Sequence, residues 1–499
     1  MKRKALLGTL FFAWIGSSTA AEPGLVALFP AGSKAGTKSE VRIEGKIDPW
    51  PCRFFCSQPG VTITPDPKKK GTILVSSKKD CVVGPIVIRA FNDEGTSEPA
   101  IFCIGGQSEL LEDAQDHGTL AGAQLIQSEN IPCVINGKLA KANEVDSYRI
   151  PLKKGQALYA AVDGYSLRSP IDPLLHLYDA KGARLLLAHD NAVNLDPLIV
   201  FQAPADGDYT LSIMAFDHPP TASVAFAGSS KSIYRIHLAT SRKDLPARFF
   251  PAPLKPDSAS ATLTFPSQVD GTLLHPGEID SFAITANKGA NILVKVEAFR
   301  FRYPTDPVLF LRKKDGTLIK QIDDSKLNRD AAYVWKIPGD DTYQIQVIDR
   351  FGRGGEDFRY RLSVIPPEKD FSATIEKSSY RLAPGKSVPL KITLTRNDHT
   401  AGLSLRATGL PRGVTLEVPQ SIPTKSGDFS VKLTASSECK NAAGAFRLLL
   451  KEKEGKTTRE KPVVFSFQDG RSRGPFLIDD IPDIWLSVGK PAKNKSTGK

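Results

Sequence analysis

An internal duplication constrains the fold of this chain more than any other feature. The stretch Asp172 to Gly182 (DPLLHLYDAKG) returns 134 residues later as Asp306 to Gly316 (DPVLFLRKKDG). The same offset relates identical residues on both sides of it: Gly137 and Gly271, Glu144 and Glu278, Asp146 and Asp280, Gly155 and Gly289, Asp190 and Asp324, Asp196 and Asp330, Tyr209 and Tyr343. A fixed offset over such a span indicates two copies of one structural module.

Each copy has the pattern of a β-sandwich. Short apolar runs alternate with polar residues, as in Tyr148-Arg149-Ile150, and no helical period competes with this pattern. The copies end in YRIHL (234–238) and YRLSV (360–364), an offset of 126, so the first copy carries eight extra residues in a loop-like stretch. We therefore predict a first repeat over 131–240, a second over 263–366, and a stiff linker over 241–262.

The flanking segments, 23–105 and 370–468, also consist of short strand-like runs separated by Gly and Pro. Both resemble immunoglobulin-like domains, and the first resembles the IPT/TIG kind over its opening PGLVALFPAGSKAGTKSEVRIEG. The predicted fold class is all-β, with four β-sandwich domains in series: Ig-like, two jelly-roll repeats, Ig-like. Residues 106–130 are expected to form an acidic linker, and 469–499 a C-terminal tail.

The chain begins with the features of an export signal. Lys2-Arg3-Lys4 precedes a short apolar run, Ala5 to Gly16, and small residues follow up to Ala20. We expect residues 1–20 to be a Sec-type signal peptide and the mature protein to be secreted or periplasmic, with no transmembrane segment. The net charge of +12 is spread along the chain apart from the basic end KPAKNKSTGK. Nucleic acid is therefore not an expected partner.

Six cysteines suit an oxidising compartment. A metal knot is disfavoured because no CxxC pair and no nearby histidine accompany the first two cysteines. We expect two disulfides within the N-terminal segment, with the pairing open; the other two cysteines are either free or bridge distant domains. The expected bridging set is Cys52, Cys56, Cys81 and Cys103, and the remaining pair is Cys133 and Cys439.

The duplicated module resembles the bacterial pre-peptidase C-terminal domain. The first copy matches at Asn136-Gly137-Lys138-Leu139, Asp146-Ser147-Tyr148, Asp172-Pro173, Asp190 and Gly207-Asp208-Tyr209, and the second at Asp270-Gly271-Thr272-Leu273, Asp280-Ser281-Phe282, Asp306-Pro307, Asp324 and Tyr343. The second copy departs from the pattern before Tyr343, where the glycine is missing. The resemblance implies a jelly-roll sandwich appended to secreted peptidases and other exported proteins, without catalysis of its own. Some members bind calcium or extracellular matrix polymers.

A calcium site is the one metal hypothesis that this resemblance supports. Calcium-binding relatives combine an acidic linker with an acidic turn before the first Tyr strand, and Ca²⁺ requires six to eight oxygen ligands. The alternative is that these side chains cap turns by accepting backbone N–H groups. The candidate ligands are Glu112, Asp113 and Asp116 in the linker and Glu144 and Asp146 in the turn.

No catalytic centre is indicated. His117-Gly118-Thr119 and Gly95-Thr96-Ser97 echo subtilisin motifs, but the serine precedes the histidine by 20 residues and no catalytic domain fits between them. HExxH and P-loop motifs are absent from the sequence. We therefore expect a non-catalytic binding or scaffolding protein for polysaccharide or protein. The alternatives are an accessory subunit of a secreted peptidase or other hydrolase, and a hydrolase with paired carboxylates.

Overall fold

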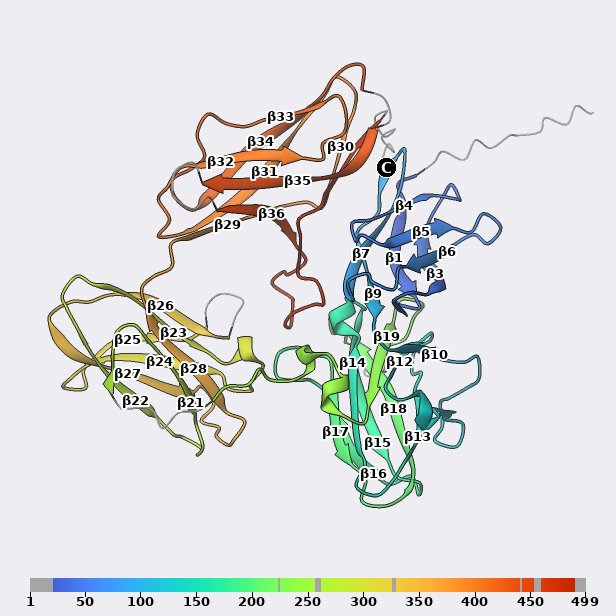
Figure 1. The fold of residues 1–499 in the computed structure, drawn as a ribbon, viewed down its shortest axis with the longest axis horizontal. Helices are drawn as coiled ribbons and strands as arrows, with labels where there is room; N and C mark the ends of the chain where they lie inside the picture. The colour runs from blue at the N-terminus through green and yellow to red at the C-terminus, as the bar shows by residue number, and fades with distance from the viewer. Residues whose placement is uncertain are drawn as a thin grey trace, which may run out of the picture.

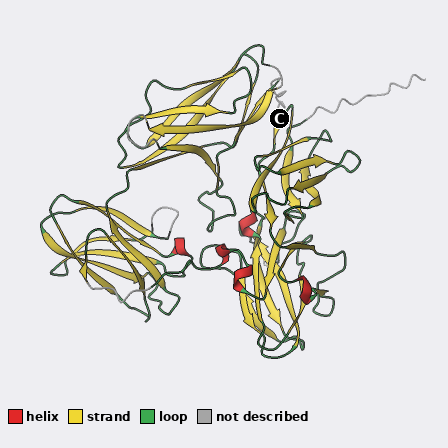
Figure 2. Cartoon of the chain, in the orientation of Figure 1, coloured by secondary structure: helices red, strands yellow, loops and turns green. Residues whose placement is uncertain are grey.

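The computed structural model describes residues 21–222, 225–255, 262–324, 329–439, 442–452 and 459–489. The expected signal peptide and the basic end lie outside these residues. Strands dominate every domain, and the helical segments of the described residues are single 3₁₀ turns (Figures 1 and 2). No helix in the described ranges is long and apolar enough to cross a bilayer. The expected all-β fold class, a series of β-sandwich domains, is confirmed.

The N-terminal domain packs two sheets face to face. Their strand orders are β1-β3-β6-β5 and β2-β9-β7-β4, with β8 paired to β7. Alternate residues of the strands, such as Val41 and Ile43, are buried between the sheets. The strands are β1 (Gly24–Phe29), β2 (Gly32–Lys34), β3 (Lys38–Lys46), β4 (Arg53–Cys56), β5 (Val61–Pro65), β6 (Thr72–Ser77), β7 (Gly84–Asn92), β8 (Gly95–Thr96) and β9 (Ala100–Gly105).

The first repeat is a sandwich of two five-stranded sheets, β10-β12-β19-β14-β17 and β11-β13-β18-β15-β16. Its core is one continuous apolar cluster that includes Ile150, Leu175 and Ile236. The strands are β10 (Ser108–Leu111), β11 (Gln124–Leu125), β12 (Cys133–Lys138), β13 (Asp146–Leu152), β14 (Ala157–Asp163), β15 (Ile171–Tyr178), β16 (Arg184–Ala188), β17 (Leu198–Gln202), β18 (Gly207–Asp217) and β19 (Ile233–Ala239); the 3₁₀ turns are η1 (Ser128–Asn130) and η2 (Tyr165–Leu167).

The second repeat has the same topology except that no strand of its described residues corresponds to β10; its sheets are β21-β28-β23-β26 and β20-β22-β27-β24-β25. The change of offset falls between β18 and β19 of the first repeat, where the sequence predicts a longer loop. The strands are β20 (Thr262–Leu263), β21 (Ser267–Thr272), β22 (Asp280–Ala286), β23 (Asn291–Glu297), β24 (Pro307–Lys313), β25 (Leu318–Ile322), β26 (Ala331–Lys336), β27 (Asp341–Asp349) and β28 (Arg359–Ile365); the turn equivalent to η2 is η5 (Phe299–Phe301).

Several residues that recur in both repeats hold the fold. A Cβ on Gly137 would lie 2.2 Å from the Tyr234 ring, and one on Gly271 would lie 2.3 Å from the Tyr360 ring, so only glycine lets the tyrosine cross the strand. Asp196 accepts three backbone N–H groups of η2, and Asp330 accepts three of η5. These recurrences are therefore explained by packing and turn capping.

The C-terminal domain is larger than the segment 370–468. Its strand order is β30-β38-β35-β36-β29-β31-β34-β33, with β32 paired to β35 and β37 to β36. The strand β38 comes from the expected tail. The strands are β29 (Asp370–Ile375), β30 (Ser379–Leu382), β31 (Ser387–Asn397), β32 (Leu403–Thr408), β33 (Val414–Glu417), β34 (Gly427–Ala435), β35 (Ala442–Glu452), β36 (Glu460–Ser466), β37 (Asp480–Ile481) and β38 (Ile484–Val488).

Two segments that were expected to be a linker and a tail contribute strands in the structure. The stretch 106–130, expected as a linker, contributes β10 and β11 to the two sheets of the first repeat, because Leu110 and Ile126 pack on the core of that repeat. The tail contributes β38 because Ile484, Leu486 and Val488 are all buried in the core of the C-terminal domain. Both stretches are too short and too mixed in composition to signal strands by pattern.

The expected disulfides are not present in the structure, in which all six cysteines are unpaired. Successive side chains of a strand point to opposite faces. On β9, Phe102 and Ile104 point into the core of the N-terminal domain, whereas Cys103 points to the opposite side. Cys103 is therefore separated by its own strand from Cys52, Cys56 and Cys81, which lie in or against that core.

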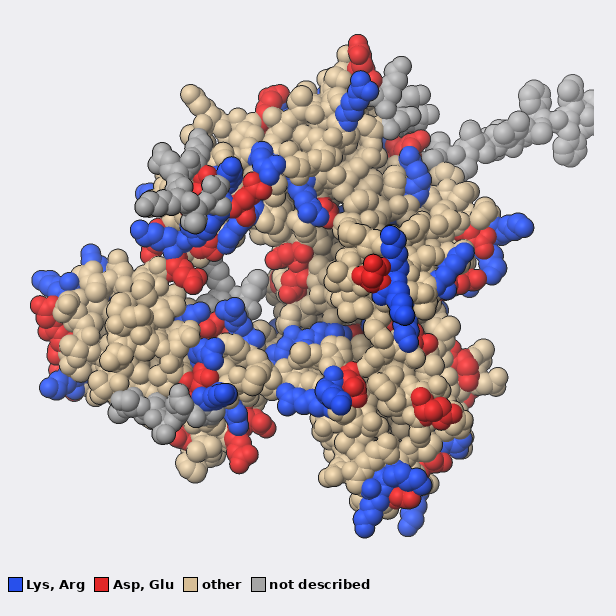
Figure 3. All heavy atoms as spheres, viewed as in Figure 1, with Lys and Arg blue, Asp and Glu red and all other residues tan. Residues whose placement is uncertain are grey.

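The chain closes on itself (Figure 1). The N-terminal domain lies against the first repeat, the second repeat forms a separate lobe, and the C-terminal domain returns to the N-terminal domain. Trp485 on β38 contacts Phe55 and Phe91, with ring centroids 5.4 and 4.6 Å away, and Arg89 donates to the Ser378 carbonyl at 3.1 Å. On the face drawn in Figure 3, basic and acidic side chains are interspersed.

Candidate functional site

A cavity of about 360 Å³ lies where the N-terminal domain meets the first repeat. Four parts of the chain line it: the start of β7 with the end of β9, the strands β12 and β19, the linker that follows the first repeat, and the tail at Leu477. Val83, at the rim, is 55% exposed, so the cavity reaches the surface. Its size falls in the range of about 300–1,000 Å³ that is typical of small-molecule sites.

A buried ionic network forms the polar wall of this cavity. Asp163, at the end of β14, is 1% exposed and accepts from His237 Nε2 at 2.7 Å and from Arg248 Nη2 at 2.6 and 2.9 Å. Arg235 on β19 donates to Glu109 at 2.5 Å and lies 3.8 Å from Asp163. The two arginines and the two carboxylates thus balance each other's charge within the wall.

The same side chains leave hydrogen-bonding atoms without a partner among the described residues. These atoms are Nε of Arg235, Nε of Arg248, Nδ1 of His237 and Oε1 of Gln107, and each is buried. All four residues line the cavity. Because buried polar groups are normally paired, four orphaned atoms around one cavity indicate that a polar molecule or water completes them.

Protonation decides what the histidine offers. Burial lowers the pKa of His237 to about 4, so the ring is neutral near pH 7. The proton of the neutral ring sits on Nε2, which faces the Asp163 carboxylate, and Nδ1 is then an acceptor. The orphaned set therefore consists of two donors, the arginine Nε atoms, and two acceptors, His237 Nδ1 and Gln107 Oε1.

Glycine and the strand pattern explain how the sequence builds this wall. A Cβ on Gly32 would lie 2.7 Å from the Arg235 guanidinium. The strand β2 can therefore lie this close to the arginine because residue 32 has no side chain. Arg235 and His237 alternate along β19 and share a face. In the sequence, YRIHL (234–238) indicates only a strand. The second repeat has Ser363 where the first has His237, and this difference between the copies was the signal that could have found the site.

The predicted calcium ligands separate into two groups. Glu112 accepts from the Lys138 N–H at 2.9 Å, and it lies close enough to Asp146 to raise the pKa of that group. Asp146 is buried, and its other partner is the Tyr234 hydroxyl at 2.7 Å. Burial and the Glu112 charge raise the pKa of Asp146 to about 8. Glu112 and Asp146 thus lie together as a carboxyl pair, and the Glu144 charge is near enough to raise the pKa of both groups.

The other three predicted ligands each accept a hydrogen bond from a nearby backbone N–H group. Asp113 accepts from the His117 ring at 2.7 Å and from the Gln115 N–H, Asp116 accepts from the Gly118 N–H, and Glu144 accepts from the Lys141 N–H. Such bonds are those of turn-capping side chains.

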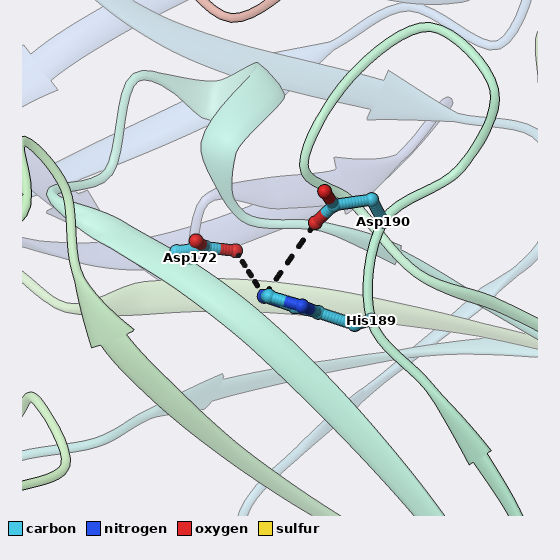
Figure 4. A group of neighbouring side chains, drawn as sticks. All are labelled: Asp172, His189 and Asp190. Atoms are coloured by element: carbon cyan, nitrogen blue, oxygen red, sulfur yellow. Dashed lines mark hydrogen bonds and ion pairs between the residues drawn. The ribbon is translucent and has the colours of Figure 1, made fainter. Parts of the chain in front are cut away.

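A further acidic cluster joins the duplicated motif to the end of the next strand. Asp172 Oδ1 lies 2.9 Å from His189 Nε2, and Asp190 lies 3.5 Å from the same nitrogen. Figure 4 shows both carboxylates directed at the imidazole. The duplication relates Asp190 to Asp324 in the sequence. It does not indicate that these residues lie close to Asp172 and Asp306, the first residues of the repeated motif.

Comparison with known proteins leaves the family open. No family model and no curated protein matches the chain. Among solved structures, the pre-peptidase C-terminal domain of a Bacillus anthracis collagenase is 16% identical, covering 22% of this chain and 99% of its own, with a TM-score of 0.17.

Two further solved structures span more of the chain. A Bacteroides ovatus protein, SGBP-B of a mixed-linkage glucan utilization locus in complex with a heptasaccharide, is 10% identical over 67% of this chain and 72% of its own, with a TM-score of 0.15. The four N-terminal Ig domains of Dscam1 isoform 4.44 are 10% identical over 94% and 97%, with a TM-score of 0.20.

Proposed function

We propose that this chain is an exported, non-catalytic binding protein that holds a sugar unit of a polysaccharide in the cavity between the N-terminal domain and the first repeat. The observation that carries the proposal is the set of four buried, unpartnered polar atoms around that cavity. The remainder of the lining includes aliphatic side chains such as Val134, Leu245 and Leu477.

The chemistry of the wall favours an uncharged, hydroxylated ligand over an anion. Both arginines already face a carboxylate, Glu109 or Asp163, so little positive charge is left for a ligand. What remains is a balanced set of two donors and two acceptors. Sugar hydroxyls both donate and accept, so adjacent hydroxyls of one ring can satisfy such a set. Aliphatic walls then cover the apolar C–H surface of the ring.

A glycan-binding experiment tests this proposal. The mature chain is applied to neutral and uronic-acid oligosaccharides, and each glycan that binds is then titrated in solution. We expect neutral glycans to bind, and Gln107→Leu to weaken them by about tenfold because a buried acceptor is lost. Gln268→Leu is the matched control, since Gln268 also donates one side-chain hydrogen bond but lies in the second repeat.

Three results would contradict the proposal: no glycan bound at about 1 mM, a concentration at which even feeble specific binding is detected; binding of uronic acids alone; or equal affinity for wild type and Gln107→Leu.

A further inference from the structure

The acidic cluster of the first repeat has a counterpart in the second repeat with a different composition. Asp306, just before β24, lies beside Asp323 and Asp324, just after β25, because Leu309 pairs with Ile322 across these antiparallel strands. One carboxylate oxygen from each of the three residues lies within 4.8 Å of the others. The equivalent residues in the first repeat are Asp172, His189 and Asp190. The duplication has therefore placed three carboxylates where the first copy has two carboxylates and an imidazole.

Two oxygen atoms of the second cluster are buried without a partner among the described residues. They are Oδ1 of Asp306 and Oδ1 of Asp323. Asp306 is 8% exposed, and its carboxylate makes no hydrogen bond within the described part of the chain. Burying a carboxylate without a hydrogen bond or a cation is costly. The first copy avoids this cost because Asp172 Oδ1 accepts from His189.

The arginine near the second cluster does not pair with the two unpartnered oxygens. Arg350 Nη1 lies 2.9 Å from Asp323 Oδ2 and 3.5 Å from Asp324 Oδ2, so it contacts the oxygen of Asp323 that is opposite to the orphaned one. Arg329 lies over the Phe299 ring, 5.6 Å from its centroid.

We propose that Asp306, Asp323 and Asp324 form a divalent-cation site in the second repeat. Three carboxylates offer only oxygen, the ligand of the hard cations. Calcium–oxygen distances of about 2.3–2.6 Å allow ligand oxygens up to roughly 5 Å apart across the ion, which matches the spacing of this cluster. Water completes the shell, so we expect the modest affinity of an extracellular module, with a Kd of about 10⁻⁴–10⁻³ M.

Equilibrium dialysis of the mature chain against radioactive Ca²⁺ tests the site. We expect one ion to be lost in Asp306→Asn, which removes the charge and keeps the shape of the side chain. Asp172→Asn, the equivalent change in the first repeat, is the matched control and should retain that ion. The double variant Glu112→Gln/Asp146→Asn, which removes the carboxyl pair of the first repeat, should also retain it.

A variant at an exposed position separates loss of Ca²⁺ binding from loss of folding. Asp324 is 43% exposed, so Asp324→Asn should fold and should weaken Ca²⁺ binding at least tenfold. The melting temperature of wild type should rise on adding Ca²⁺ and fall on adding EDTA, and it should respond to neither in Asp306→Asn. Absence of binding at about 10 mM Ca²⁺, well above the expected Kd, would overturn the proposal. So would binding that survives in Asp306→Asn and Asp324→Asn but is lost in the double variant.

Discussion

Asp163 keeps a negative charge in a place where almost no water reaches. Burial opposes its ionisation, but Arg248 and His237 lower the pKa of Asp163 far below the usual range. The arrangement is stabilising only as a set, because removing one member of a buried charge network leaves the others unpaired. In return the network orients the Arg248 and His237 side chains, which line the cavity and each keep one buried nitrogen without a partner among the described residues.

Asp146 is the residue whose titration should be visible in stability. Its pKa is about 8 in the folded protein and close to 4 in an unfolded chain, so folding binds a proton between these values. Stability from this group is present below about pH 4 and is lost as pH rises through about 8. Asp146→Asn mimics the protonated carboxyl. We expect the variant to gain at least about 2 kcal/mol over wild type between pH 5 and pH 9.

Thermal melts of both proteins across this pH range measure the effect. Tyr234 donates to Asp146 in wild type and can donate to the amide oxygen of the variant, so that hydrogen bond is not a confounding loss. Melting temperatures of the two proteins that stay parallel from pH 5 to pH 9 would show that Asp146 does not hold a proton in the fold.

At this scale the sequence analysis could identify residue types but not their partners. Identical residues at a fixed offset, such as Gly137 and Gly271, point to structural roles, and both glycines do admit a tyrosine ring. The five proposed calcium ligands were chosen by order along the chain. Which of them converge depends on how β10 and β12 align, and a short parallel pairing leaves no periodic signal in sequence.

Among the elements, β38 packs in two directions, because its two faces contact different domains. Ile484, Leu486 and Val488 enter the core of the C-terminal domain, whereas Trp485 faces Phe55 and Phe91 of the N-terminal domain. From the sequence, these residues were expected to belong to a C-terminal tail. The five residues of β38 carry too little pattern to indicate a strand, whereas the eleven residues of β31 alternate between exposed and buried positions over most of their length.

Substitutions on the two faces of β38 should have different consequences. Leu486→Ala should destabilise the C-terminal domain itself, by about 2–5 kcal/mol, because its side chain is fully buried in that core. Trp485→Ala should remove a similar amount, about 3–5 kcal/mol, from the contact between the two domains.

Small-angle scattering and thermal melts separate these effects. We expect Trp485→Ala to enlarge the radius of gyration with little change in the melting of the C-terminal domain, and Leu486→Ala to lower that melting temperature. An unchanged radius of gyration in Trp485→Ala would contradict the assignment of this residue to the contact between domains.

For the whole molecule, the segment from Arg473 to Leu477 ties the tail to the first repeat. The Arg473 N–H donates to the Tyr165 hydroxyl at 2.7 Å, and the Leu477 N–H donates to the Ser166 carbonyl at 2.8 Å. The Phe476 ring lies 5.0 Å from that of Tyr165. Domain order could be predicted from the sequence, but this contact joins residues about 300 positions apart, and no local pattern encodes it.

Gly474 should be essential for this tie. Its φ is +111°, and a Cβ there would lie 1.8 Å from the Val193 carbonyl oxygen, so Gly474→Ala must push the segment away from the first repeat. We expect the amides of Arg473 and Leu477 to exchange hydrogen at least about tenfold faster in this variant. Gly470→Ala is the control, because a Cβ at that position meets nothing within 4 Å. Equal protection in both variants would contradict the prediction.

The return of the chain to its start also determines how the molecule would carry a mechanical load. At the two ends of the described chain, the Ala21 carbonyl accepts from Asn92, and Gly489 lies beside Asp93. A force that pulls these ends apart therefore acts first on the junction at Trp485 and Arg89. The second repeat, which lies midway around the closed path, bears tension only after that junction and the tie between the segment from Arg473 to Leu477 and the first repeat have both opened. The protein would lengthen in two stages, and its repeats would stay folded through the first.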